Sequence, residues 1–224
     1  MKIQFYSLTT VEDARAAVEA GADLIGLVVD DSGKVPEEIT PEQAHAIFAA
    51  IDGRALGIAL SMSTDPASIC EMAEVVRPHA VHLAASDLTV EGLAEVRRSI
   101  GETRIMAAVP VTDAGAVEVA RERAEYADYL LLDSKSASDP FTGATGETHD
   151  WSVSRRIVEA VTVPAVLAGG LSPTNVRDAI VAVRPWGVDS FTHTNRPGER
   201  IRKDAALMRA FAVAAHSAAK DLAL

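Results

Sequence analysis

Cysteine and aromatic residues are scarce in this sequence. The 224 residues include one cysteine, Cys70, so no intramolecular disulfide can form. Aromatic residues make up 4% and apolar residues 48%, which predicts a core built mainly from Ala, Val, Leu and Ile. The length fits one large α/β domain with a substantial hydrophobic core.

Positive charge is also in short supply. The sequence has 21 Lys and Arg against 32 Asp and Glu, a formal net charge of −11. Proteins that bind nucleic acid or anionic membranes are normally basic, so we expect neither partner. A small anionic substrate stays compatible with this charge, because helix N-termini and backbone amides can bind an anion locally.

Targeting segments and metal-binding motifs are missing as well. No apolar run approaches the length of a membrane span, and residues 1–5 are too few and too polar for a signal peptide, so we expect a cytoplasmic protein. HExxH motifs, paired cysteines and spaced His/Asp clusters do not occur, and we therefore expect no metal site. A Ser/His/Asp arrangement with a nucleophile elbow is likewise absent from the sequence.

Short apolar runs alternate with helical patterns along the chain. The predicted strands are Lys2–Ser7, Leu24–Asp30, Ala55–Ser61, Ala80–Ala85, Arg104–Val109, Tyr129–Asp133, Ala165–Ala168 and Gly187–Phe191. The predicted helices are Val11–Ala20, Pro41–Ala50, Pro66–Val76, Val90–Ile100, Ala114–Glu125, Trp151–Val161, Asn175–Val183 and Lys203–Lys220. Repeated strand–helix units imply parallel strands joined by right-handed crossovers. Eight units predict a single (β/α)8 TIM barrel over residues 1–224.

A doubly wound open sheet is the alternative fold. The first strand-to-helix turn, residues 7–10, has no glycine fingerprint for a dinucleotide, which counts against that alternative. In a barrel, the active site forms at the C-terminal ends of the strands. The residues that follow each apolar run are therefore the ones to inspect for chemistry.

Asp133 ends the apolar run Tyr129-Leu130-Leu131-Leu132. A carboxyl group at the end of such a strand is partly desolvated, which raises its pKa and suits a general acid. The alternative for Asp133 is a helix cap or a loop salt bridge. The connection that follows, residues 134–150, is the longest in the chain and is rich in Ser, Gly and Thr, as binding loops and lids often are.

Gly169 and Gly170 follow the seventh predicted strand and precede a helix that begins near Asn175. Glycines allow a phosphate to approach backbone amides, and the loops after strands seven and eight often bind phosphate in this fold. We therefore predict that Gly169, Gly170 and Asn175 contribute to a phosphate or carboxylate site. An ordinary turn is the alternative.

Two histidines lie near predicted strand ends. His193 follows the eighth strand and could act as an acid or base, or contact an anion together with Arg196; a solvated loop histidine is the alternative. His82 lies within the run Ala80-Val81-His82-Leu83 and could be either a pocket residue or a satisfied histidine inside the barrel.

Several motifs together carry a family resemblance. They are Leu8-Thr9-Thr10-Val11-Glu12-Asp13-Ala14, Gly21-Ala22-Asp23-Leu24-Ile25-Gly26, Asp133 with Gly143-Ala144-Thr145-Gly146 and His149-Asp150-Trp151, Leu167-Ala168-Gly169-Gly170-Leu171-Ser172-Pro173-Thr174-Asn175-Val176, and Gly187-Val188-Asp189 with Pro197-Gly198 and Lys203-Asp204. With these motifs the chain resembles the phosphoribosylanthranilate isomerase family of tryptophan biosynthesis over essentially its full length.

The resemblance implies an Amadori rearrangement, in which a phosphoribosylamine opens its ring and becomes an aminodeoxyribulose phosphate. It implies an intramolecular aldose–ketose isomerase that needs no cofactor and acts on a small phosphorylated sugar as a monomer or a homodimer. The family's general acid, an aspartate after strand six, matches Asp133. Backbone amides after strands seven and eight hold the phosphate in the family, which points to Gly169, Gly170 and Thr192 here.

The sequence differs from the family at four points around this site. Tyr6-Ser7 stands where the family has Cys-Gly, whose cysteine is the general base, and a tyrosine is a poor base near neutral pH. Ser32-Gly33-Lys34 replaces Ser-Pro-Arg and keeps a cation at Lys34 for the substrate. The other replacements are His82-Leu83-Ala84-Ala85 for Gln-Leu-His-Gly and Phe191-Thr192-His193 for Ser-Ser-Gly.

These differences leave three functions open. The first is a sugar-phosphate isomerase of this family with Asp133 as the acid and Tyr6, His82 or His193 as the base. The second is an epimerase, lyase or aldolase of the same fold that acts on a different carbonyl substrate. The third is a non-catalytic descendant that binds a metabolite.

Overall fold

Strands and helices alternate along the chain in the computed structural model, which describes residues 1–29, 33, 35–85, 87–134 and 147–223. The strands are β1 (Lys2–Phe5), β2 (Leu24–Val29), β3 (Glu38–Ile39), β4 (Leu56–Ser61), β5 (Ala80–Leu83), β6 (Arg104–Pro110), β7 (Tyr129–Asp133), β8 (Ala165–Leu167) and β9 (Gly187–Ser190). The helices are α1 (Val11–Ala20), α2 (Pro41–Ile51), α3 (Pro66–Val76), α4 (Val90–Ser99), α5 (Ala116–Ala124), α6 (Trp151–Ala160), α7 (Val176–Val183) and α8 (Ala205–Asp221), with a 3-10 helix η1 (Thr192–Thr194).

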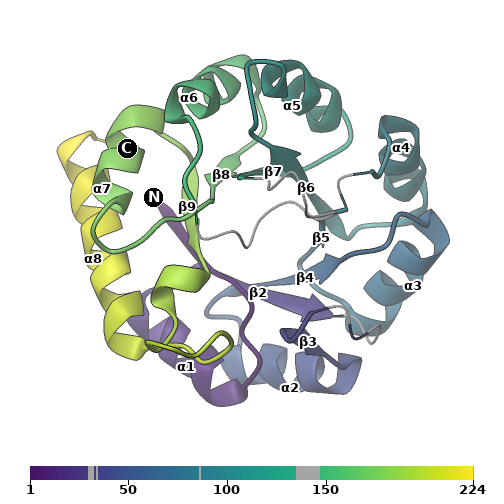
Figure 1. Cartoon of the computed structure of the whole chain (residues 1–224). Helices are drawn as coiled ribbons and strands as arrows, with labels where there is room; N and C mark the ends of the chain where they lie inside the picture. Colours follow the sequence, from purple (N-terminus) through teal and green to yellow (C-terminus); the bar gives the residue numbers. More distant parts are fainter. Residues whose placement is uncertain (30–32, 34, 86, 135–146, 224) are drawn as a thin grey trace.

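The strands close into a barrel. The sheet order is β1-β9-β8-β7-β6-β5-β4-β2-β3, and β1 also pairs with β2, so eight strands form a ring and the two-residue β3 is attached outside it. Every pairing between these strands is parallel. Figure 1 shows the helices surrounding the strands on all sides. The predicted (β/α)8 barrel is confirmed, and the closed ring rules out the open-sheet alternative.

Local sequence signals set the ends of the helices. Thr10 caps α1 by accepting a hydrogen bond from the Asp13 amide, and Gly21 ends the helix at φ 103°. Thr40 and Gln43 form a reciprocal capping box at the start of α2. Such signals explain why the predicted bounds of the strands and helices differ from the observed ones by no more than two residues.

Successive side chains of each strand point alternately to the helices and to the barrel interior. Phe5, for example, faces outward and meets Phe211 of α8 edge to face at 5.8 Å. The interior is filled by Leu24, Ile58, Ala80, Met106, Tyr129, Leu131, Val166 and Ala168. A smaller cluster of Tyr6, Val28 and Met62 lies near the C-terminal ends of its strands, with Val35, Leu60 and Phe191 packed against it. The core is aliphatic, as the composition predicts.

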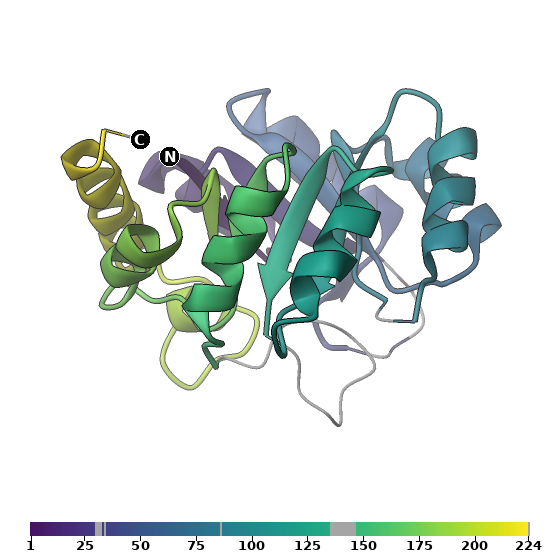
Figure 2. The same ribbon diagram turned by 90° about the horizontal axis from the view of Figure 1, so that it is seen from above.

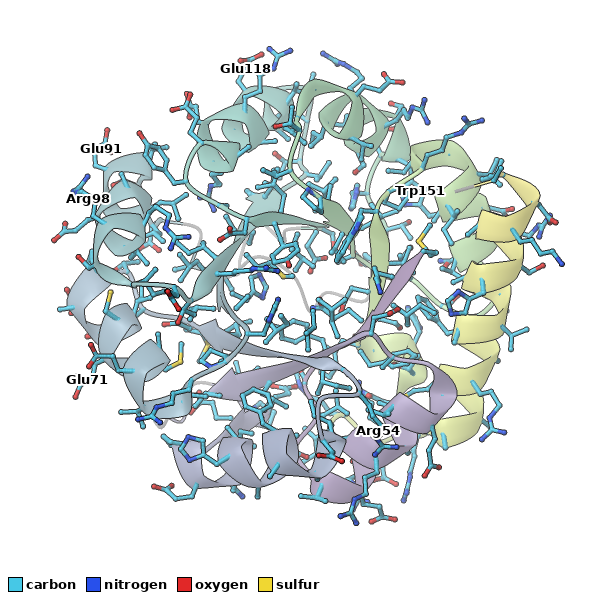
Figure 3. The ribbon with its side chains drawn as sticks, turned by 180° about the vertical axis from the view of Figure 1, so that it is seen from behind. Arg54, Glu71, Glu91, Arg98, Glu118 and Trp151 are labelled. Atoms are coloured by element: carbon cyan, nitrogen blue, oxygen red, sulfur yellow. The ribbon has the colours of Figure 1, made fainter. Side chains whose placement is uncertain are left out.

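The barrel has two different ends. Figure 2 shows the arrowhead of β7 pointing to the end at which η1 and the loop after it lie, while both chain termini lie at the opposite end. On the outside, Figure 3 shows Glu71, Glu91, Arg98 and Glu118 directed away from the barrel into solvent. Across the residues that the structure describes, no helix has the length and apolarity needed to cross a membrane.

Candidate active site

Asp133 is the last residue of β7 and is 8% exposed. Its Oδ1 accepts a hydrogen bond of 2.7 Å from the Ser134 amide and a longer one of 3.4 Å from the Ser134 hydroxyl. Burial raises the pKa of Asp133 to about 7, although both bonds from Ser134 oppose that shift. A carboxyl group with such a pKa can carry and release a proton near neutral pH.

The turn of Gly169 and Gly170 lies directly beside this carboxyl. Both glycines have positive φ, +82° and +60°, which disfavours other residues. A Cβ on Gly169 would stand 3.1 Å from Asp133 Oδ1 and 3.1 Å from the Ser134 amide nitrogen, so the backbone approaches the acid closely. Asn175 fixes the turn, because its Nδ2 donates to Gly170 O at 3.0 Å and its Oδ1 accepts from the Ser172 amide at 2.8 Å.

His149 is a third group at this position, and in the sequence it stands out only as part of the motif His149-Asp150-Trp151. The same Gly169 Cβ would stand 3.0 Å from His149 Nδ1. The other nitrogen, Nε2, lies 2.6 Å from Ser154 Oγ on α6. Burial lowers the pKa of His149 to about 4, so its imidazole is neutral at physiological pH.

Asp189, on β9, is a second buried carboxyl that the sequence analysis did not single out. It is 6% exposed, and its Oδ1 has no hydrogen-bond partner among the described residues. Burial raises the pKa of Asp189 well above its usual value; repulsion from Asp133 adds to the shift, and attraction to Lys203 opposes it. Its place within a strand, rather than after one, is why a search of strand ends missed it.

Lys203 is buried just before α8, with 2% of its surface exposed. Its Nζ donates to Phe191 O at 3.0 Å and to Asn195 Oδ1 at 2.7 Å, and it lies 4.7 Å from the centre of the Phe191 ring. Burial lowers the pKa of Lys203 to about 7, while the carboxylate of Asp189 opposes that shift. The lysine therefore holds the segment around η1 against the start of α8 and interacts electrostatically with Asp189.

Tyr6 and His82 contact each other across the barrel. The Tyr6 hydroxyl lies 2.7 Å from His82 Nδ1, and the two rings meet edge to face with centres 5.4 Å apart. Burial, with repulsion from Asp189, raises the pKa of Tyr6 well above 10. Burial lowers the pKa of His82 to about 3, and its Nε2 lacks a partner in the described part of the chain. Both side chains are therefore uncharged near neutral pH.

His193 and Thr192 are exposed on η1, away from the interior. Arg196 follows them, and its Nε donates to Lys203 O at 3.1 Å. All three line a pocket of about 550 Å³, together with Phe191, Asn195, Pro197, Gly198, Glu199, Arg200 and Leu207. Lys34, the remaining predicted substrate contact, lies outside the described residues.

The structure thus brings Asp133, Gly169 and Gly170 together and places Asn175 behind the turn. The Tyr6–His82 pair lies within the barrel, and His193, Thr192 and Arg196 lie together on the loop after β9. Over the residues described, no three His, Cys, Asp or Glu side chains are grouped so that they could hold a metal ion.

Comparison with known sequences gives one consistent result. The family model described as N-(5'-phosphoribosyl)anthranilate (PRA) isomerase matches residues 3–212. The N-(5'-phosphoribosyl)anthranilate isomerase of Methanocella arvoryzae is 35% identical over 210 residues, which cover 94% of this chain and 95% of the relative. The enzyme of the same name from Halobacterium salinarum strain R1 is 36% identical over 212 residues, covering 94% and 93%.

Solved structures agree with the sequences. Phosphoribosyl anthranilate isomerase from Thermotoga maritima superposes with a TM-score of 0.82 at 28% identity, covering 97% of this chain and 99% of that one. A phosphoribosyl anthranilate isomerase in complex with reduced 1-(o-carboxyphenylamino)-1-deoxyribulose 5-phosphate gives a TM-score of 0.80 at 27% identity, with the same coverage. Another Thermotoga maritima structure, of monomers made from the dimeric enzyme, gives 0.79 at 28% identity, again covering 97% and 99%.

Proposed function

The chain belongs to the phosphoribosylanthranilate isomerase family, and we propose that it isomerises a phosphoribosylamine to the corresponding aminoketose phosphate. Members of this family are aldose–ketose isomerases, and the activity belongs to tryptophan biosynthesis. The observation that carries the proposal for this chain is the buried carboxyl of Asp133 packed against the Gly169 turn. An acid and an anion-binding turn side by side are what ring opening of a phosphorylated sugar requires.

Asp133 is the general acid. It gives its proton to the ring oxygen of the sugar as the bond from that oxygen to C1 breaks, and the nitrogen lone pair forms a C1=N double bond. The pKa of about 7 supports this role, because the protonated carboxyl is available at neutral pH.

Asp189 accepts the proton from C2. Loss of that proton turns the C1=N intermediate into an enolamine, which becomes the ketone when C1 is protonated and the C2 hydroxyl loses its proton. Two facts support this role: the Asp189 Oδ1 is unpaired among the described residues, and attraction to Lys203 favours the ionised carboxylate. Burial and repulsion from Asp133 raise the pKa of Asp189, so the fraction of the enzyme with Asp189 ionised carries out this step.

Tyr6, His82 and His193 stay alternative candidates for the base. Burial raises the pKa of Tyr6, so its phenol stays neutral near pH 7 and lacks the negative charge of a phenolate base. Burial lowers the pKa of His82 to about 3, so its imidazole has too little affinity for a proton. His193 is exposed on η1 and is better placed to contact an anion.

The substrate phosphate binds at the loops after β8 and β9. Positive φ at Gly169 and Gly170 turns that loop toward the N-terminus of α7, whose amides attract anions. Asn175 shapes the turn, while Thr192 and Arg196 contribute contacts from the loop after β9. Lys34 stays a prediction from the sequence as a cation for the substrate. We also propose one domain over residues 1–224, without a cofactor, that acts as a monomer or homodimer; the cytoplasmic location stays a prediction from the sequence.

The test is turnover of phosphoribosyl anthranilate by the purified protein, with Asp133→Asn as the matched variant. We expect turnover by the wild type and a loss of about 10²–10⁴-fold in the variant, the usual contribution of a general acid. Absence of turnover in the wild type, with unchanged folding, would refute the proposed substrate. Activity in Asp133→Asn equal to that of the wild type would refute the assignment of the acid.

A further inference from the structure

Three polar atoms converge on the bare Cα of Gly169. A Cβ at this position would lie 3.0 Å from His149 Nδ1 and 3.1 Å from both Asp133 Oδ1 and the Ser134 amide nitrogen. His149 Nδ1 and Asp133 Oδ1 can therefore be no farther apart than the sum of these two distances. The Ser134 amide is already used, because it donates to Asp133 Oδ1 at 2.7 Å.

Of these three polar atoms, His149 Nδ1 is the one without a hydrogen-bond partner among the described residues, and it is buried. A buried polar atom without a partner costs free energy, so native structures retain one mainly where something else binds it. His149 Nδ1 lies against Gly169, whose backbone also approaches Asp133, so a group bound to Nδ1 would lie close to the proposed acid.

Ser154 is the hydrogen-bond partner that favours one of the two neutral tautomers of His149. Its hydroxyl lies on the inner face of α6, is fully buried and is 2.6 Å from Nε2. A buried hydroxyl has to donate its proton, and Nε2 is the acceptor within reach. When Nε2 accepts, the proton of the neutral imidazole is on Nδ1. The atom that faces Asp133 is then a hydrogen-bond donor.

Burial also keeps this donor uncharged. The pKa of His149 is lowered to about 4 by desolvation, and only the neighbouring Asp150 acts in the opposite direction. A neutral N–H group does not compete with Asp133 as an acid, because it keeps its proton throughout the reaction. It can still stabilise negative charge that develops on an oxygen.

We propose that His149 is a catalytic residue whose Nδ1–H donates a hydrogen bond to the same sugar ring oxygen that Asp133 protonates. This inference rests on the proposed function. As the C1–O bond breaks, its electron pair moves to the oxygen, the Asp133 proton follows, and the His149 N–H stabilises the developing charge. Asp133 and His149 thus act on two different lone pairs of one oxygen.

Three substitutions at one position test the donor. His149→Asn places an amide N–H where Nδ1 is, His149→Gln places one where Nε2 is, and His149→Phe keeps a ring without a donor. We expect Phe and Gln to lower kcat for phosphoribosyl anthranilate by about 10–100-fold with little change in KM, since removal of a transition-state donor acts on kcat. We expect Asn to stay within about fivefold of the wild type. Full activity in the Phe variant, or equal losses in the Asn and Phe variants, would overturn the proposal.

Folding and tautomer are checked separately. The double variant His149→Phe/Ser154→Ala removes the hydroxyl that the single change leaves unpaired, so it should melt close to the wild type and show the same loss of kcat. Nitrogen-15 NMR of the wild type should show His149 protonated at Nδ1 at pH 7, and protonation at Nε2 instead would overturn the proposal.

One measurement separates this inference from the proposed function. If the wild type turns over phosphoribosyl anthranilate and His149→Phe does so equally well, only the role of His149 fails. If the wild type has no such activity, the proposed function fails, and the affinity for ribose 5-phosphate then tests the donor directly. A loss of affinity in the Phe variant that the Asn variant restores would support the donor, and equal affinity in all three proteins would overturn it.

Discussion

The Tyr6 hydroxyl lies 2.7 Å from His82 Nδ1 and thereby joins the end of β1 to β5 across the barrel. The contact is possible because Gly26, on the adjacent β2, leaves room for the tyrosine ring. A Cβ on Gly26 would stand only 2.4 Å from two ring carbons of Tyr6. The site is therefore built on a buried, neutral pair at the place where the family resemblance implies a reactive cysteine.

The fit between Tyr6 and Gly26 predicts a double-mutant interaction. Gly26→Ala should destabilise the protein by about 1–3 kcal/mol, the usual cost of overpacking a core. In a Tyr6→Ala background the same change should cost much less, because the ring that it contacts is gone. Urea denaturation of the four proteins measures the interaction. Equal costs of Gly26→Ala in the two backgrounds would show that the contact does not limit stability.

The choice of base is tested by comparing Asp189 with Tyr6. Asp189→Asn should lower kcat by about 10²–10⁴-fold, as loss of a general base does. Tyr6→Phe removes one buried hydrogen bond and should change kcat by less than about tenfold. Steady-state kinetics with phosphoribosyl anthranilate decides the matter. The reverse order, with a severe effect of Tyr6→Phe and a mild one of Asp189→Asn, would restore Tyr6 and His82 as the proton-accepting pair.

The raised pKa of Asp133 predicts how the activity depends on pH. A general acid has to be protonated, so kcat/KM should fall as the pH rises through about 7, the pKa of this buried carboxyl. A pH profile of kcat/KM measures it. A profile that stays flat up to pH 9 would contradict the assignment, because the acid would then titrate elsewhere.

The same raised pKa predicts how the free energy of unfolding depends on pH. The pKa of Asp133 is raised from 3.8 to about 7 in the folded state, so the contribution of this carboxyl is fully present below pH 3.8 and is lost as the pH rises through 7. Relative to Asp133→Asn, the wild type should therefore lose on the order of 2–4 kcal/mol between pH 4 and pH 8. Thermal or urea unfolding of the two proteins at both pH values provides the measurement. A stability difference that is independent of pH would contradict the raised pKa.

Gly169 offers a comparison with a matched control. Gly169→Ala places a methyl group against Asp133, Ser134 and His149 at φ +82°, whereas Gly101→Ala has a positive φ of +67° and no heavy atom within 4 Å. Both should show the cost of a left-handed residue, about 1–2 kcal/mol. Only Gly169→Ala should also reduce activity and weaken competitive inhibition by inorganic phosphate. Similar activity in the two variants would mean that the substrate does not bind against the backbone of Gly169.

The fold was predictable because its signals are local. Thr40 followed by Pro41, or Gly21 after α1, marks a helix end within a few residues, and the apolar runs mark the strands. Asp133 and Gly169 were predictable for the same reason, since each follows a strand directly. His149 and Asp189 were not, because their importance comes from contacts with other elements that no short sequence pattern records.

The chemistry of Tyr6 illustrates the same limit. The sequence shows only that a tyrosine replaces a cysteine, and it leaves the phenol open as a base. Its partner His82 is 76 residues away, and burial by several strands sets the pKa of both side chains. Such effects depend on the closed barrel as a whole, so they follow from the structure alone.

The contact between Tyr6 and Gly26 also restricts how these two positions can vary. A small residue at position 6 tolerates glycine or alanine on β2, whereas a tyrosine there requires glycine. While Tyr6 is present, a side chain larger than glycine at position 26 would have to displace the tyrosine ring, and with it the hydroxyl that contacts His82. Positions 6 and 26 are therefore expected to vary together rather than independently.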